Sequence, residues 1–183
     1  MQEKISVKIF SIAEIMGNDD VGVITLIDET GKRMLSIVCD AIIKHEIHLR
    51  LSNDKSCNTM LPEILANILK NQVGYNFEII INDIIDGEYR AMIVNTDTAQ
   101  PLSMRATDAV LLHLASKVPL YVTNALMRRQ GVPFVPGSHS MPIPFNVLTD
   151  KMLREAMDYA VEHENYEMAS KFRDELKKRN NPF

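Results

Sequence analysis

The chain has 183 residues, of which 46% are hydrophobic and 24% are charged, and its formal net charge is −4. This length and composition predict one globular domain with a small appendage and exclude a chain that is disordered throughout. The negative charge excludes the strongly basic surface of a protein that binds nucleic acid regardless of sequence, although it leaves room for a local basic patch.

Two further features bear on the cellular compartment. No stretch approaches the ~18 uninterrupted apolar residues of a membrane span, and the first residues lack the apolar core of a signal peptide. The two cysteines, Cys39 and Cys57, lie in no CxxC pair. We therefore expect a cytoplasmic protein with reduced thiols and no membrane partner.

Three short strands are predicted at the beginning of the chain. Residues 4–9 and 21–27 are rich in β-branched side chains, and the segment RMLSIVC continues the pattern after the turn sequence DETGK. A helix with an imperfect apolar pattern is expected over residues 40–51. A clearer helix follows over residues 61–74, and its apolar face is formed by Ile64, Leu65, Ile68 and Leu69.

The same pattern starts again near residue 75. The segments YNFEIIIND and EYRAMIVNT are predicted strands joined by the two-residue turn Asp86-Gly87, and QPLSM is short and extended. A helix over residues 105–116, a strand in VPLYVT and a short helix over residues 124–130 complete the domain. Three strands followed by a helix thus occur twice. The fold class is therefore predicted as α+β, with duplicated β-β-β-α units forming a mixed sheet, helices packed on it and a C-terminal α-hairpin.

The two units share a motif at the point where the third strand enters the helix, which reads DAIIKH in the first unit and DAVLLH in the second. Capping explains Asp40 and Asp108 without catalysis, because a carboxylate at a helix start meets free N–H groups. His45 and His113 lie about 140° around the helix from these acids, so they share no ligand within their own helix. A site can still form where the two helix starts approach each other and pool both acids.

The rest of the chain divides into two parts. Residues 136–147 are rich in proline and predict a linker or an extended arm after a domain of residues 1–135. Residues 148–183 predict a helical hairpin with Asn165 as the cap of its second helix. A helix pair of this size buries too little surface to stand alone, so we expect it to dock on the domain, on a second copy or on another protein.

The hairpin resembles the UVR motif, a protein-contact element of bacterial excision-repair proteins and of some protease adaptors. The resemblance rests on Leu153, Ala156 and the segment ENYEMASKFRDEL. It implies a protein partner that contacts Tyr166, Glu167, Arg173 and Asp174. A generic amphipathic hairpin is the alternative interpretation.

The first 135 residues resemble the bifunctional nuclease domain. The matching segments are LSIV and RATDAVLLHLASKVPLYV, in which Arg105, Asp108, Ala109, Pro119 and Val122 agree with the family pattern. The resemblance implies an α+β, dimeric protein that cleaves DNA or RNA. A family His-Asp pair aligns best with Pro62-Glu63, so the family histidine is missing here.

Phosphodiester hydrolysis needs carboxylates, an activated water and a cation near the phosphate. The candidate catalytic residues are therefore Asp108, Asp40 and Glu63 as acids and Arg105 as the phosphate clamp. Asp108 and Asp40 are the expected ligands of a divalent metal ion, magnesium or manganese. Each has a structural alternative, since Arg105 and Asp108 can form a simple i,i+3 ion pair and Glu63 suits any first helical turn.

The segment DIIDGEYR contains three acids but is set aside, because its Asp-Gly pair predicts a hairpin turn in solvent. Two functions remain. The first is a metal-assisted nuclease with nucleic acid as its substrate. The second is a non-catalytic, homodimeric interaction or adaptor protein in DNA repair or stress response, which the missing histidine and the docking hairpin favour.

Overall fold

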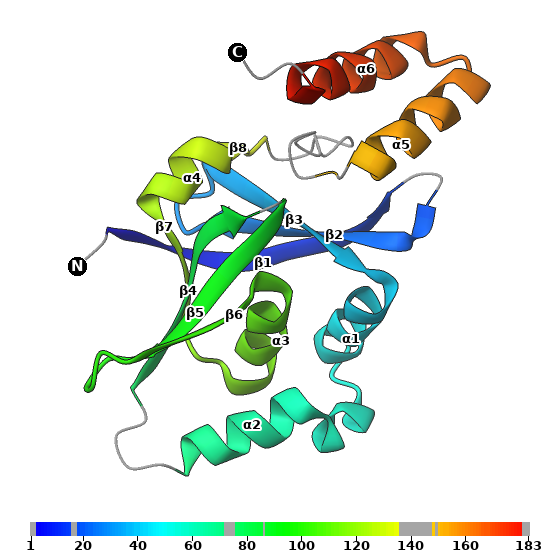
Figure 1. The fold of residues 1–183 in the computed structure, drawn as a ribbon. Helices are drawn as coiled ribbons and strands as arrows, with labels where there is room; N and C mark the ends of the chain where they lie inside the picture. The colour runs from blue at the N-terminus through cyan, green and yellow to red at the C-terminus, as the bar shows by residue number, and fades with distance from the viewer. Residues whose placement is uncertain are drawn as a thin grey trace.

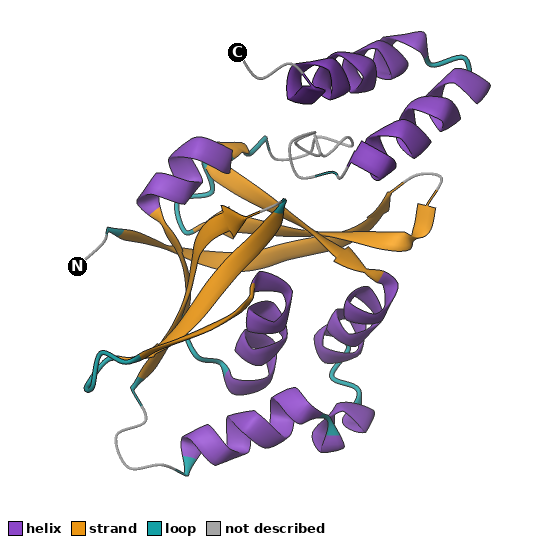
Figure 2. Cartoon of the chain, viewed as in Figure 1, coloured by secondary structure: helices purple, strands orange, loops and turns teal. Residues whose placement is uncertain are grey.

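The computed structural model describes residues 3–15, 18–71, 76–85, 87–135, 148 and 150–180 of the chain. Within these residues the chain forms an α+β fold, in which helices cover both faces of one mixed eight-stranded sheet (Figures 1 and 2). The proline-rich segment 136–147 lies outside the described residues. No helix in the described part is long and apolar enough to cross a membrane.

The first β-β-β-α unit is an antiparallel meander that ends in a helix. Its elements are β1 (Lys4–Ile15), β2 (Asn18–Asp28), β3 (Arg33–Asp40) and α1 (Ala41–Leu51). Strand β1 extends beyond the predicted strand over residues 4–9, because it pairs with β2 as far as Ile15. The 3-10 helix η1 (Lys55–Thr59) and the helix α2 (Leu61–Lys70) follow it.

The second unit repeats this arrangement. Its elements are β4 (Phe77–Ile85), β5 (Glu88–Asn95), β6 (Pro101–Arg105) and α3 (Ala106–Ser116). Ile85 pairs with Glu88, so the turn predicted from Asp-Gly joins β4 to β5. The domain ends with β7 (Leu120–Thr123), α4 (Asn124–Gln130) and the short strand β8 (Val132–Pro133). The duplicated α+β architecture predicted from the sequence is therefore confirmed.

Strand β7 joins the two units into one sheet. The strand order is β6-β5-β4-β7-β1-β2-β3-β8, so β7 lies between the first strands of the two meanders. It runs parallel to β4 and antiparallel to β1. The outermost strands of the sheet are thus β6 and β8, and the ends of β3 and β6 belong to opposite halves.

The main core lies between the sheet and the helices α1 and α3, which lie next to each other on one face (Figure 1). Completely buried aliphatic side chains come from both units, including Leu26, Leu35, Ile47, Ile79 and Ile81. Burying a side chain of this kind contributes about 1.5–3 kcal/mol. This apolar layer fixes the two helix starts relative to each other.

Helix α2 turns its apolar face away from this core. Ala66 is buried, whereas Leu61, Ile64, Leu65 and Ile68 are 77%, 45%, 38% and 52% exposed. These four residues follow the i, i+3, i+4, i+7 spacing of one helix face. The strongest amphipathic pattern in the sequence therefore marks a surface of the single chain, and only Leu69 of the predicted face packs partly against the main core.

The C-terminal hairpin consists of α5 (Asp150–Glu162) and α6 (Tyr166–Asn180) and has a core of its own. Asn165 caps α6, since its Oδ1 accepts a hydrogen bond from the Met168 amide at 3.3 Å. The hairpin core consists of Leu148, Leu153, Ala160, Ala169, Phe172 and Leu176. Val38 of β3 packs against this core, so the hairpin contacts the domain as its small size requires.

Candidate functional site

Strand β3 passes directly into α1 at Asp40. Asp40 has extended backbone angles, and its side chain accepts a hydrogen bond from the Ile43 amide at 2.8 Å. This bond satisfies one of the N–H groups that a helix start leaves free. The Asp40 carboxylate is otherwise exposed, so it is both a helix cap and a negative charge on the surface.

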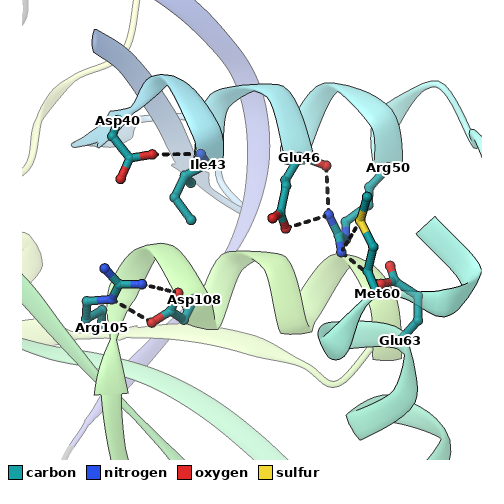
Figure 3. A network of polar contacts seen from close by, with 8 residues as sticks. All are labelled: Asp40, Ile43, Glu46, Arg50, Met60, Glu63, Arg105 and Asp108. Carbon is teal, nitrogen blue, oxygen red and sulfur yellow. Dashed lines mark hydrogen bonds and ion pairs between the residues drawn. The ribbon is translucent and has the colours of Figure 1, made fainter. Parts of the chain in front are cut away.

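Strand β6 passes into α3 in the same way at Arg105. The Arg105 guanidinium donates two hydrogen bonds to Asp108, from Nε to Oδ2 at 2.7 Å and from Nη2 to Oδ1 at 2.9 Å (Figure 3). The hydrogen bonds and the charge of Asp108 raise the pKa of Arg105, and the charges of Asp40 and Glu88 raise it further. The Arg105 guanidinium is thus bonded to one carboxylate, Asp108, and lies within electrostatic range of two more, Asp40 and Glu88.

A pocket of about 320 Å³ lies between these two junctions. Strand ends, the β4–β5 turn and the hairpin all contribute to the wall of this junction pocket, which consists of Asp20, Val21, Ile37, Val38, Cys39, Asp40, Gly87, Glu88, Tyr89, Arg105, Thr107 and Met152. Asp40 and Arg105 thus meet at one cavity although they belong to different units. Asp108 is not part of this wall, but it is bonded to Arg105, which is.

The wall of the junction pocket is more acidic than basic. Asp20, Asp40 and Glu88 line it together with a single arginine, and Glu88 also pairs with Arg90 at 3.1 Å. The Arg105–Asp108 pair is open to solvent, with 56% and 39% of the two side chains exposed. Such exposed pairs contribute about 0–1 kcal/mol, so an incoming anion can displace Asp108 at little cost.

Two polar side chains of the wall are unsuited to nucleophilic attack. Burial raises the pKa of the Cys39 thiol to about 11, so the thiol stays protonated at neutral pH. Burial likewise raises the pKa of the Tyr89 phenol. These two groups help to form the wall of the pocket.

Glu63 lies away from the junction pocket. It accepts a hydrogen bond from Arg50 at 2.8 Å, and Glu46 binds the same guanidinium at 3.2 Å (Figure 3). Only 3% of the Arg50 side chain is exposed, so this network fastens the end of α1 to the start of α2. The structure therefore brings together three of the four predicted catalytic residues and places Glu63 in a separate ion-pair network.

A metal site enclosed by the protein does not form here. Among the residues that the structure describes, no group of three or more His, Cys, Asp or Glu is arranged to hold a metal ion. The Asp40 and Asp108 carboxylates belong to the two helix starts that meet at the pocket.

The histidines of the repeated motif have structural roles or lie in solvent. His113 Nδ1 lies 2.7 Å from the Val118 carbonyl oxygen, and burial lowers the pKa of its ring. His45 is exposed on α1. In the repeated motif, Asp40 lines the pocket and Asp108 is bonded to Arg105 of its wall, whereas His45 and His113 do not line it.

Reasoning from the sequence named only Asp40 and Arg105 among the wall residues, and it missed Glu88 and Met152 among others. Glu88 belongs to the DIIDGEYR segment that was assigned to a solvated turn, and Met152 belongs to the hairpin. The turn assignment is correct, but the turn lies beside the start of α3 because β5 pairs with β6, where Arg90 lies opposite Arg105. Nothing in the local sequence indicates that Met152 reaches the domain.

The predicted contact residues of the hairpin lie on its surface. Tyr166 is 65% exposed, Glu167 pairs with Lys171 at 2.6 Å, and Arg173 pairs with Asp174 at 3.1 Å. None of the four belongs to the hairpin core. They are therefore placed where a second protein can reach them.

Comparison with known proteins identifies two matching regions. A family model described as the bifunctional nuclease domain matches residues 24–134, and a model described as the UvrB/uvrC motif matches residues 151–178. No curated protein matches the chain. The first match covers more than half of the chain and includes the strand-to-helix junctions of both units. Both resemblances noted in the sequence are thus confirmed, in the same order.

The network around Arg50 generates the first prediction. We expect the substitution Glu63→Gln to lower the free energy of unfolding by about 3 kcal/mol, because it leaves a buried arginine with one fewer carboxylate. Urea denaturation followed by circular dichroism measures this change. The control Glu167→Gln removes an exposed pair and is expected to change stability by less than about 1 kcal/mol. An unchanged stability for Glu63→Gln would contradict the structural role.

Proposed function

We propose that this chain, which belongs to the bifunctional nuclease domain family, is a nuclease that hydrolyses phosphodiester bonds of DNA or RNA in the junction pocket. One observation carries the proposal. Asp40 and Arg105, which lie in different units of the duplicated fold and both within the region that matches the family, line a single cavity, and Arg105 is paired with Asp108. Ion pairs that serve stability alone need no such cavity.

Arg105 is the proposed phosphate-binding residue. Its planar guanidinium matches two phosphate oxygens in the same way that it now matches the two oxygens of Asp108. When a phosphodiester takes the place of Asp108, Arg105 neutralises charge on the group under attack. The released Asp108 carboxylate then lies beside the scissile bond. There it can serve the reaction by binding a cation or by accepting a proton.

Asp40 and Asp108 are the proposed carboxylates of the reaction. They would hold a divalent ion together with the substrate's own phosphate, and that ion would supply charge neutralisation and a water of lowered pKa. Asp40 keeps its hydrogen bond to the Ile43 amide, so its position is set by the helix start. Glu63 has no part in this proposal, because Arg50 holds it elsewhere.

Cleavage assays with matched arginine variants test the proposal. We expect Arg105→Gln to lower cleavage of single-stranded or duplex substrates by about a hundredfold, because a preorganised donor to the phosphate is lost. Arg129→Gln is the control, since Arg129 is also 56% exposed and pairs with Asp83 at 2.9 Å but lines no part of the pocket.

The same assay decides the role of the metal. Cleavage is measured with magnesium, with manganese and with a chelator, and Asp108→Ala is measured beside the wild-type protein. If the wild-type protein cleaves no faster than Asp108→Ala with magnesium, with manganese and with the chelator alike, the nuclease proposal is wrong.

A non-catalytic interaction protein is the second candidate function. It is favoured by the engagement of Arg105 with Asp108 and by the UvrB/uvrC motif at residues 151–178. In this alternative the hairpin binds a protein partner through Tyr166, Glu167, Arg173 and Asp174, and the domain serves as a scaffold in DNA repair or stress response.

Affinity capture with hairpin variants tests this alternative. We expect a partner captured by the wild-type protein to be lost with the double substitution Tyr166→Ala and Arg173→Ala, since exposed aromatic and arginine side chains often dominate binding energy. Lys151→Ala on the same hairpin is the control, because Lys151 is 85% exposed and lies outside the predicted contact set. Equal capture by all three proteins would contradict a role for these residues.

A homodimer is part of both candidate functions. The exposed apolar face of α2 supports it, as do the outer edges of β6 and β8, which pair with no further strand among the described residues, because a single chain gains by covering such surfaces. Association through α2 places the same face of two copies together, as twofold symmetry requires.

Light scattering tests the dimer and its interface. We expect twice the mass of one chain at micromolar concentration, and a shift to the single-chain mass for Ile68→Asp, which buries a charge in the interface. Val161→Asp is the control, since Val161 is 49% exposed on α5 and Ile68 is 52% exposed on α2. A wild-type protein of single-chain mass would overturn the dimer, and a dimeric Ile68→Asp would exclude α2 as its interface.

A further inference from the structure

The junction pocket has a wall that the nuclease domain does not supply. Met152, in the first turn of α5, lines the pocket opposite residues of β2, β3 and the β4–β5 turn. Figure 1 shows the beginning of α5 near β2 and β3, on the face of the sheet away from α1 and α3. The C-terminal hairpin therefore takes part in the cavity where Asp40 and Arg105 meet.

Val38 connects the hairpin to the sheet. Its neighbours Ile37 and Cys39 are buried in the main core, and Val38 packs in part against the same core. Val38 also packs against the hairpin core, which includes Leu148 and Leu153 and against which Met152 packs. Val38 also lines the pocket, so the contact that holds the hairpin is continuous with the wall.

The junction pocket is small for a ligand site. A volume of about 320 Å³ is at the lower end of the roughly 300–1,000 Å³ found for ligand pockets in proteins. Such a space holds a group of about the size of one nucleotide, and an intact duplex cannot enter it. A base must leave its duplex, or belong to a single strand, before it can enter this pocket beside Arg105.

We propose that the C-terminal hairpin, docked on Val38, forms a wall of the junction pocket and restricts that pocket to unpaired nucleotides. Met152 is the specificity-determining residue of this wall. The restriction to unpaired nucleotides rests on the proposed nuclease function, whereas the docking of the hairpin does not.

A single-tryptophan reporter tests the docking. The chain contains no tryptophan, so Met152→Trp and Met157→Trp each place one fluorophore on α5, and only position 152 lines the pocket. Each is measured with and without Val38→Asn, which removes the apolar contact of the sheet. We expect Val38→Asn to increase acrylamide quenching of the fluorophore at position 152 severalfold. The quenching of the fluorophore at position 157, which packs against the hairpin core, is expected to remain unchanged.

The quenching result decides the docking without any cleavage. Circular dichroism first establishes that each variant is folded. If Val38→Asn leaves the quenching at position 152 unchanged, or increases that at position 157 equally, the hairpin is not held on β3 and the proposal is overturned. Val38→Ala is measured in parallel as a smaller perturbation, and the same shift in weaker form supports the docking.

Cleavage selectivity tests the restriction. We expect Met152→Ala, which shortens the wall, to raise the ratio of duplex to single-strand cleavage severalfold, and Met157→Ala, an equal loss of volume elsewhere on α5, to leave it unchanged. Equal ratios for the two variants would overturn the role of Met152. If the wild-type protein cleaves neither substrate, the proposed nuclease function and the restriction that rests on it both fail, and the quenching result alone decides the docking.

Discussion

The direct passage from strand to helix at Asp40 and at Arg105 is the constraint on which the site depends. Strand β3 ends at Asp40 and α1 begins at the next residue, and β6 and α3 are joined in the same way at Arg105. Because no loop separates strand from helix at these points, the positions of Asp40 and Arg105 are fixed by a strand of the sheet on one side and a helix packed on the core on the other. The duplicated fold thus brings an acid from one half and a guanidinium from the other to one cavity.

In the proposed nuclease, the charges at that cavity would give the site two states, with Asp108 bound to Arg105 or displaced from it. With Asp108 bound, Arg105 is neutralised and the wall is acidic, which repels a phosphate backbone. With Asp108 displaced, the guanidinium is available and two carboxylates remain for a cation. The small contribution of an exposed ion pair makes the exchange inexpensive. The chain's negative total charge therefore does not decide whether nucleic acid can bind at this place.

Local patterns predicted the elements of this fold and only part of its site. Features that depend on neighbouring residues can be predicted from the sequence. These are the alternation of strands and helices, the Asp-Gly turn and the Asn165 cap. The direction of the apolar face of α2, the place of β7 in the sheet and the wall formed by Glu88 and Met152 depend on residues distant in the chain. Glu63 was misplaced for the same reason, because its partner Arg50 lies on another helix.

The position of β7 has a consequence for how the molecule comes to be assembled. In the part of the sheet that the structure describes, the two meanders meet only through this strand, which follows both of them in the chain. During synthesis each meander can pair internally, but the ribosome must release residues up to Thr123 before β1 and β4 gain their shared neighbour. Until then, the facing edges of β1 and β4 are open to pairing with other chains.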